Sequence, residues 1–384
     1  MRILFFVSSM HAGGAERVAA TLASAWARRG DDVTLVPSYT KKGDCFYALD
    51  PAVELLWLAD RMGKRSGPLS SLIKKQRAMR RLVREKRPDV IVSFLTNVNI
   101  TVLASTAALG VPTIVCERTN PAASSSAGPV LKRLRRLLYP WADLVAVQTQ
   151  DSVSAFKKMV PGIRDLVVIP NPLPPELLAP HDGATLAARC RLDNGVSGRK
   201  RLIAMGRLVP AKGYESLIRA FADLAAHHAD WDLVIWGEGP LRAALTAQIG
   251  AAGLSDRVFL PGRTDAPWEK LACADVFVLS SLVEGFPNVL LEAMALERAC
   301  VAVDCPSGPR EISRDGADAL LVPLGDAQAL TQSLDALMGD PERRAQLGKR
   351  AAQSVRERFA LNEVLALWDE MLKRAIKSRN KGKA

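Results

Sequence analysis

The sequence is poor in the residues from which metal centres and disulfide frameworks are built. Six cysteines and four histidines occur among 384 residues, and no two cysteines form a C-x-x-C pair. This spacing predicts neither a zinc site nor a set of structural disulfides. We therefore expect no metal site in this protein.

Long apolar runs are also missing. None approaches the roughly 20 residues that a membrane-spanning helix needs, and the apolar run at residues 3–7 is too short for the core of a signal peptide. The composition, with 48% hydrophobic and 24% charged residues, is ordinary for a globular protein. We expect a cytoplasmic protein, and its length favours two domains.

Acidic residues are scarce in the first half of the chain. Residues 1–175 contain 25 Lys and Arg but 13 Asp and Glu, whereas residues 176–384 contain 27 of each, so the net charge of +12 lies in the first half. A basic surface attracts nucleic acid or anionic lipid headgroups. Aromatic residues for base stacking are not interleaved with the basic ones, which favours a membrane over nucleic acid.

Two basic segments, residues 69–87 and 130–141, have apolar residues at helical spacing. They could be ordinary surface helices whose apolar stripe meets the core. Alternatively, they form a patch that lies on an anionic membrane with its basic side chains at the headgroups. The second interpretation predicts an exposed basic face made by Lys74, Lys75, Arg77, Arg80, Arg81, Arg84, Lys132, Arg133, Arg135 and Arg136.

Short apolar runs alternate with helical patterns along the chain. In the first half the strand-like runs are residues 3–8, 33–37, 53–58, 90–94, 113–116 and 144–147. Such alternation predicts an open parallel sheet with helices on both faces, whose ligands bind beyond the carboxyl ends of the strands. The prolines at positions 170, 172, 174 and 175 predict a hinge, and a second series of strands begins after it.

A strand–loop–helix–strand pattern at residues 280–303 is the most informative stretch of the second half. Gly285 and Pro287 punctuate its loop, and the N–H groups at the start of the following helix suit a phosphate. Glu292, one turn into the helix, can accept hydrogen bonds from a ribose diol, and Glu284 in the loop can reach sugar hydroxyls. The pattern thus indicates a nucleotide-sugar site. The alternative is that Glu284 caps the helix and Glu292 is a solvated surface residue.

Two other loops carry candidate binding residues. The glycine-flanked loop 206–213 follows a strand and offers Arg207 and Lys212, which can hold a diphosphate as a bidentate and a point-charge ligand. Arg263, after a later strand, is a candidate contact of the nucleobase. Near the start of the chain, Gly13 and Gly14 at a strand-to-helix turn allow close approach of a phosphate or sugar, although they could equally form a tight connection.

Together these motifs resemble the signature of the retaining glycosyltransferases of family 4, which have the GT-B fold. The motifs are G-R…K-G at residues 206–213, E-x7-E enclosing G-F-P-N at 284–292, and S-G-P-R-E at 307–311. The G-G-A-E-R run at 13–17 is similar to a subgroup that builds bacterial cell-surface polysaccharides and lipid-linked glycans. The V-I-P-N-P run at 168–172 is frequent at the domain junction of the family.

The resemblance implies an α/β protein with two Rossmann-like, doubly wound parallel-sheet domains that face a central cleft. Residues 1–172 would bind the acceptor and residues 173–359 the nucleotide sugar, while a last helix at about 360–378 would pack back on the first domain. The implied activity is transfer, with retention, of a hexose or N-acetylhexosamine to a saccharide acceptor, with no metal or other cofactor. The basic face of the first domain would place the protein on the inner face of the cytoplasmic membrane.

The resemblance also implies roles for individual residues. Arg207 and Lys212 would stabilise the leaving diphosphate, Glu284 would hold the sugar and Glu292 the ribose. Glu117, where many relatives place a histidine or an acid, would orient the acceptor. The expected catalytic residues are Glu284, Arg207, Lys212 and Glu117, and the expected donor contacts are Gly13, Gly14, Gly206, Arg207, Lys212, Arg263, Glu284, Gly285, Phe286, Asn288, Val289 and Glu292.

The substrates stay open at this point. UDP is favoured as the donor nucleotide because the G-G-A-E-R subgroup so often uses UDP-hexoses and UDP-N-acetylhexosamines, and the basic face favours a lipid-linked acceptor. The alternatives are a GDP-mannose-dependent mannosyltransferase and a nucleotide-sugar epimerase or hydrolase of the same fold. A basic binding protein without enzymatic activity is less well supported, because all four of Arg207, Lys212, Glu284 and Glu292 are present.

Overall fold

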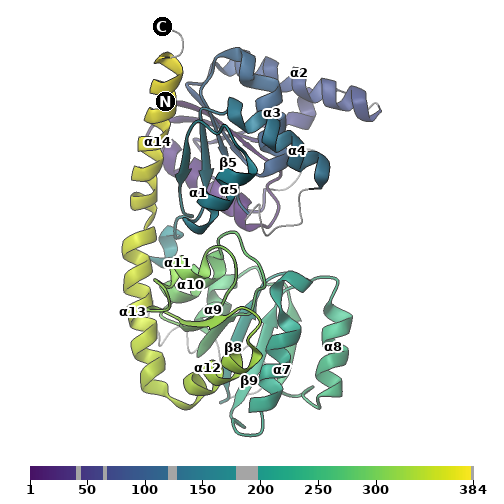
Figure 1. Ribbon diagram of the computed structural model, residues 1–384, viewed down its shortest axis with the longest axis vertical. Helices are drawn as coiled ribbons and strands as arrows, with labels where there is room; N and C mark the ends of the chain where they lie inside the picture. The colour runs from purple at the N-terminus through teal and green to yellow at the C-terminus, as the bar shows by residue number, and fades with distance from the viewer. Residues whose placement is uncertain (40–44, 64–66, 120–127, 179–197, 382–384) are drawn as a thin grey trace. The chain divides into compact units, whose positions relative to one another are not determined.

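The computed structural model describes residues 1–39, 45–63, 67–119, 128–178 and 198–381 (Figure 1). The chain forms two compact units. Unit 1 consists of Met1–Pro172 together with Asn362–Ala384, and unit 2 is Leu173–Leu361. Each is built around one parallel sheet and is described here by itself.

The sheet of unit 1 has seven parallel strands in the order β3-β2-β1-β4-β5-β6-β7. The strands are β1 (Arg2–Val7), β2 (Asp32–Pro37), β3 (Glu54–Leu55), β4 (Val90–Phe94), β5 (Thr113–Cys116), β6 (Leu144–Val147) and β7 (Leu166–Val168). Every residue of β4, β5 and β6 is buried, because a parallel sheet covered on both faces leaves no polar side. The predicted strand at 53–58 is wrong in extent: it pairs over two residues only, since a 3-10 turn (η1, Leu58–Arg61) begins three residues later.

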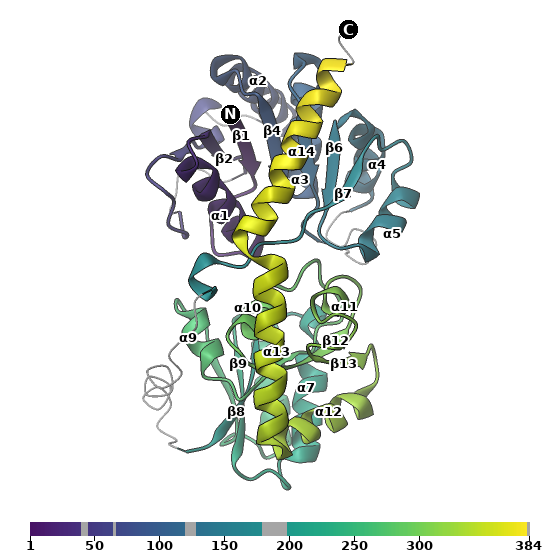
Figure 2. The same ribbon diagram turned by 90° about the vertical axis from the view of Figure 1, so that its left-hand side faces the viewer.

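Helices cover both faces of this sheet. They are α1 (Gly14–Arg28), α2 (Pro68–Lys86), α3 (Thr96–Thr106), α4 (Pro129–Leu138), α5 (Asp151–Met159) and α14 (Leu361–Lys381). The 3-10 turns η2 (Ala107–Leu109) and η3 (Tyr139–Trp141) follow α3 and α4. Figure 1 shows α2, α3 and α4 on one face, and Figure 2 shows α14 lying along the other. The last helix joins unit 1 through aromatic packing: the rings of Trp368 and Trp26 lie 5.4 Å apart, and both side chains are fully buried.

Unit 2 repeats the plan with six parallel strands in the order β10-β9-β8-β11-β12-β13. They are β8 (Lys200–Met205), β9 (Trp231–Trp236), β10 (Val258–Gly262), β11 (Val276–Leu279), β12 (Ala299–Asp304) and β13 (Leu320–Pro323). The strand order reverses between β8 and β11, and such a reversal is the point at which doubly wound sheets bind ligands.

The helices of unit 2 divide between two cores. One core packs α7 (Tyr214–Leu224), α8 (Arg242–Ala251) and α12 (Ala327–Gly339) on the sheet. The other packs α9 (Pro267–Ala272), α10 (Asn288–Ala295) and α13 (Pro341–Phe359) on the opposite face. Short turns η4 (Pro175–Leu177), η5 (Pro210–Lys212) and α11 (Pro309–Ile312) complete the unit. None of the helices within the described residues is both long and apolar enough to cross a membrane.

Candidate active site

Glycines allow the loops after β8 and β9 to pack closely against each other. A Cβ on Gly237 would lie 1.9 Å from the carbonyl oxygen of Gly206, and Gly237 has a φ of +148°. Two backbone hydrogen bonds join the same loops, from Gly206 N to Trp236 O at 2.9 Å and from Leu208 N to Glu238 O at 3.0 Å. The G-x-G-P run after β9 therefore needs its glycine at position 237, because the backbone of the loop after β8 packs directly against it.

The loop after β8 is also joined to the loop after β11. Gly213 has a φ of +64°, and a Cβ there would lie 2.2 Å from the carbonyl oxygen of Ser280. The Ser280 hydroxyl donates to the carbonyl of Lys212 at 2.8 Å, and Leu282 N donates to the carbonyl of Ala211 at 2.8 Å. These contacts fix where the side chain at position 212 starts.

The structure brings Lys212 and Glu284 together although 72 residues separate them. Lys212 Nζ donates to Glu284 Oε1 at 2.6 Å, and the two side chains are 22% and 12% exposed. Glu284 therefore does not cap α10; its carboxylate faces the lysine of the neighbouring loop. A half-buried ammonium and carboxylate at the carboxyl edge of the sheet form a polar site of the kind that binds phosphates and sugar hydroxyls.

The other predicted cations lie open at the surface. Arg207 and Arg263 are exposed, and neither forms an ion pair within the part of the chain that the structure describes. Arg207 follows Gly206 directly, on the loop that carries Lys212. Arg263 follows β10, where Gly262 O accepts a 2.7 Å hydrogen bond from Gly237 N, so it comes from the third of the joined loops.

Glu292 is buried within α10, at 2% exposure. Trp268 Nε1 of α9 donates to its Oε2 at 3.2 Å, so the alternative of a solvated surface residue is wrong. Of the residues before it, Gly285, Asn288 and Val289 are half-buried. Phe286 is buried and packs edge-on against Phe359 of α13, with ring centroids 5.7 Å apart.

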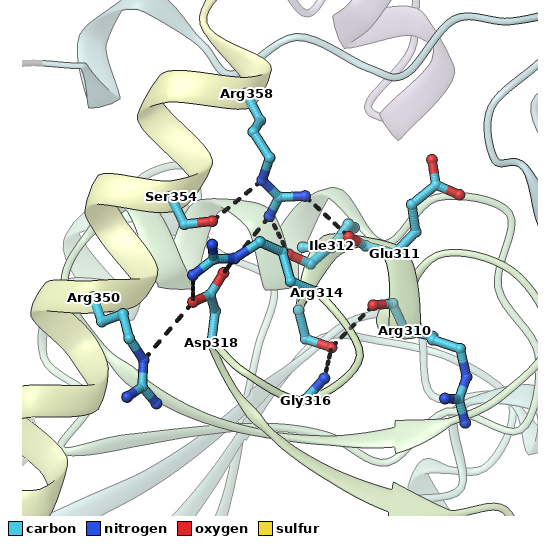
Figure 3. Close-up of polar contacts among 10 residues, drawn as sticks. Arg310, Glu311, Ile312, Arg314, Gly316, Asp318, Arg350, Ser354 and Arg358 are labelled. Carbon is cyan, nitrogen blue, oxygen red and sulfur yellow. Dashed lines mark hydrogen bonds and ion pairs between the residues drawn. The ribbon is translucent and has the colours of Figure 1, made fainter.

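A cluster around Asp318 positions the S-G-P-R-E loop (Figure 3). The Asp318 carboxylate is fully buried and accepts hydrogen bonds from Arg314 at 2.6 and 2.7 Å, while Arg350 and Arg358 of α13 lie 3.8 Å away. Arg358 in turn donates to the carbonyl of Glu311 at 3.0 Å. Burial acts to raise the pKa of Asp318, but the hydrogen bonds and charges around it outweigh burial, so its pKa lies below the usual carboxyl value.

The glycine turn of unit 1 is shaped by Glu16. The Glu16 carboxylate accepts hydrogen bonds from the hydroxyls of Ser8 and Ser9, at 3.2 and 3.0 Å. A Cβ on Gly13 would lie 2.3 Å from that carboxylate, so Gly13 leaves room for Glu16 to fold back on the start of α1. Gly14, the first residue of α1, is exposed.

Glu117, after β5, lies in a closed polar network. It is 2% exposed and accepts hydrogen bonds from Thr96 at 2.7 Å and from the Tyr139 hydroxyl at 2.5 Å. Arg135 lies 3.8 Å away, at 2% exposure. Burial raises the pKa of Glu117 above the usual carboxyl value despite these partners. Both carboxylate oxygens have protein partners, and the predicted contact with an acceptor stays a prediction.

The basic helices match the expected exposed face only in part. Lys132, Arg133 and Arg136 of α4 are exposed, but Arg135 and Lys75 are buried, so their assignment to that face is wrong. The reason is local: Arg135 turns inward to Glu117, and Lys75 lies over the ring of Tyr39. Large apolar side chains are exposed beside the basic ones, at Val130, Leu137 and Trp141.

Sequence reasoning did not find Asp318 or Tyr139, and it placed Arg135 on the exposed basic face. The importance of each follows from partners that come from other elements. Arg135 and Asp318 have charged neighbours in the sequence, so nothing in the sequence separates these buried charges from surface charges.

Comparison with known proteins agrees with this architecture. The family model "Glycosyl transferases group 1" matches residues 193–354, and the model "Glycosyl transferase 4-like domain" matches residues 13–172. The chain is 27% identical over 377 residues to GalNAc-alpha-(1->4)-GalNAc-alpha-(1->3)-diNAcBac-PP-undecaprenol alpha-1,4-N-acetyl-D-galactosaminyltransferase of Campylobacter jejuni, covering 97% of this chain and 98% of that one.

Solved structures share the fold. Sucrose-phosphate synthase from Thermosynechococcus elongatus superposes with a TM-score of 0.84 at 19% identity, over 98% of this chain and 100% of that one. The Anabaena protein HepE, in complex with UDP and glucose, gives a TM-score of 0.78 at 22% identity, over 97% of this chain and 99% of that one. The chain thus belongs to the group 1 glycosyltransferases: it is a glycosyltransferase with two parallel-sheet α/β domains of the GT-B fold.

Proposed function

We propose that this glycosyltransferase moves a hexose or N-acetylhexosamine from a UDP-linked donor to a lipid-linked saccharide, with retention at the anomeric carbon. The observation that carries the proposal is the pairing of Lys212 with Glu284 at 2.6 Å at the carboxyl edge of the second sheet, with the exposed Arg207 on the same loop as Lys212. These are a cation for a diphosphate, a carboxylate for sugar hydroxyls and a second cation that can bind phosphate bidentately.

The leaving diphosphate is the group that needs stabilising. Negative charge grows on it as the bond to the sugar breaks, and cations fixed in advance near that charge lower the barrier. The backbone of the loop that carries Lys212 is fixed by its contacts with Ser280 and Leu282. The first turn of α10 adds backbone N–H groups, which favour an anion.

The relatives support the choice of substrates. The Campylobacter jejuni relative is named for transferring N-acetylgalactosamine to an undecaprenyl-diphosphate-linked saccharide, and HepE binds UDP and glucose. A similar role places this protein in bacterial glycan biosynthesis. A GDP-mannose donor is the second candidate for the nucleotide, and a panel of nucleotides separates the two.

A lipid-linked acceptor requires access to a membrane surface. The exposed Val130, Leu137 and Trp141 lie before and after the exposed Lys132, Arg133 and Arg136 along α4 and η3. We include in the proposal that this face lies on anionic lipid, where each basic residue contributes about 1 kcal/mol and each buried apolar side chain about 1.5–3 kcal/mol.

Vesicle sedimentation tests this part of the proposal. We expect the protein to bind phosphatidylglycerol vesicles more strongly than phosphatidylcholine vesicles, and we expect Leu137→Ala with Trp141→Ala to weaken that binding at least tenfold. Leu324→Ala in unit 2, which removes a comparably exposed apolar side chain, is the matched control and should bind as the wild type does. Equal binding of the double variant and the wild type would exclude this face as the contact.

The transfer reaction itself tests the rest. Purified protein is incubated with radiolabelled UDP-sugars and a panel of polyprenyl-diphosphate-linked saccharides, and label in the lipid extract is measured beside UDP release. We expect label in the lipid and UDP release that depends on the acceptor. UDP release at the same rate without acceptor, with free sugar as the product, would identify a hydrolase instead. Conversion of the donor sugar to its epimer without UDP release would identify an epimerase.

A further inference from the structure

The hydroxyl of Tyr214 is buried and has no hydrogen-bond partner in the described part of the chain. Tyr214 is the first residue of α7 and is 2% exposed, and its hydroxyl oxygen is inaccessible and unpaired. Buried tyrosine hydroxyls usually find a partner, and an unpaired one costs about 1–3 kcal/mol. The phenol ring alone would pack as well without the hydroxyl, so the oxygen requires an explanation of its own.

The hydroxyl lies within the candidate donor site. A Cβ on Gly206 would stand 2.9 Å from the Tyr214 hydroxyl and 3.1 Å from Cε of Lys212. The hydroxyl and the lysine stem thus flank the same backbone position, the first one after β8. Burial raises the pKa of Tyr214, and the charge of Glu284 raises it further, so the group stays an O–H donor near neutral pH.

The stem of Lys212 and the Tyr214 hydroxyl lie close to the same backbone position. The ammonium is directed to Glu284, and the stem that carries it lies against Gly206 beside the hydroxyl. A lysine that turned from Glu284 to an anion would move its stem away from that position. An anion that took the place of the stem beside Gly206 would meet the Tyr214 hydroxyl.

We propose that Tyr214 is a further binding residue for the diphosphate of the donor, to which its hydroxyl donates a hydrogen bond. This inference rests on the function proposed above and extends it to a residue outside the G-R…K-G motif. A neutral O–H donor adds a directional contact to the attraction of the two cations for the diphosphate, since a hydrogen bond to a charged oxygen is short and strongly oriented. It also explains the unpaired oxygen, because the hydroxyl has its partner only in the nucleotide complex.

Tyr214→Phe tests the proposal because its two expected effects have opposite signs. UDP affinity, measured by isothermal titration calorimetry, should fall about tenfold to a hundredfold, the range for a hydrogen bond to a charged group. The stability of the ligand-free variant in urea should equal or exceed that of the wild type, because an unpaired buried oxygen is removed. A purely structural residue would not lose UDP affinity while gaining stability.

Tyr139→Phe is the matched control. Its hydroxyl is also fully buried but donates to Glu117 and accepts from Asn99, so its removal should lower stability and leave UDP affinity unchanged. Unchanged UDP affinity in Tyr214→Phe overturns the inference and leaves the proposed function standing. A loss of stability in Tyr214→Phe also overturns it, because the hydroxyl would then have a partner within the protein. Failure of the wild type to bind any nucleoside diphosphate overturns both.

Discussion

Replacing Asp318 by asparagine should destabilise unit 2 through the loop that follows β12. Asp318 is fully buried and takes two hydrogen bonds from Arg314, with two further arginines at 3.8 Å. Asparagine removes the negative charge and presents an N–H₂ group to at least one cation. A hydrogen bond to a charged group contributes about 1.5–3 kcal/mol. Arg314 and Arg350 are half-exposed and regain water when released, so the expected loss is about 2–3 kcal/mol in all.

The loss can be measured by urea denaturation at pH 7 with Asp335→Asn as the control. Asp335 is likewise paired, with His228 at 2.6 Å, but the Asp335 side chain is 58% exposed. Exposed pairs contribute little, so this variant should lose less than about 1 kcal/mol. Equal stability of Asp318→Asn and the wild type would refute the positioning role given to the cluster.

The pH dependence of the free energy of unfolding provides an independent test of the role of Asp318. Because the folded state lowers the pKa of Asp318, its contribution is fully present above the unfolded carboxyl pKa of about 3.9 and disappears as the pH falls through the lowered folded value. The stability difference between wild type and Asp318→Asn should be constant from pH 5 to 8 and shrink below about pH 4. A difference that grows on acidification would contradict the assignment.

Two further substitutions probe the donor site. Glu284→Gln keeps the shape but removes the charge beside Lys212, and we expect the transfer rate to fall on the order of a hundredfold with the fold retained; an unchanged initial rate would remove Glu284 from the mechanism. Gly237→Ala should destabilise unit 2 by several kcal/mol, because the new Cβ would meet Gly206 O at 1.9 Å. Gly250→Ala, in a helix with open space around the new Cβ, should instead be neutral or stabilising by up to about 1 kcal/mol. If Gly250→Ala lowered the thermal midpoint more than Gly237→Ala did, the close contact at Gly237 would be contradicted.

Much of the fold could be predicted because its signals are local. Largely apolar runs such as residues 90–94 and 276–279 become central parallel strands, and the alternation of strands with helices determines the doubly wound topology. The strand predicted at 53–58 is too long for a reason that is also local: the apolar pattern continues to residue 58, but the backbone turns at Leu58. Unit 2 begins at Leu173, within the run of prolines at positions 170–175.

The site could be predicted only where a motif keeps its residues close in sequence. G-R…K-G and E-x7-E each lie on one loop and its helix, and the structure places Lys212 and Glu284 in contact. Burial could not be predicted. Lys75 and Arg135 occupy positions that look exposed by spacing, and both are turned inward by partners on other elements. Asp318 gains its meaning in the same way, from Arg350 and Arg358 of α13.

The central claim, that unit 2 binds a nucleoside diphosphate through Lys212, is tested most directly by thermal denaturation without added metal. UDP, GDP and ADP are compared on the wild type and on Lys212→Ala. A ligand that binds only the folded state stabilises it by about 2.7 kcal/mol at one hundred times its Kd. The account predicts a concentration-dependent rise of the wild-type midpoint with UDP, a smaller rise or none with GDP and ADP, and loss of the UDP effect in Lys212→Ala. A midpoint that none of the three nucleotides moves, or that UDP moves equally in both proteins, would contradict it.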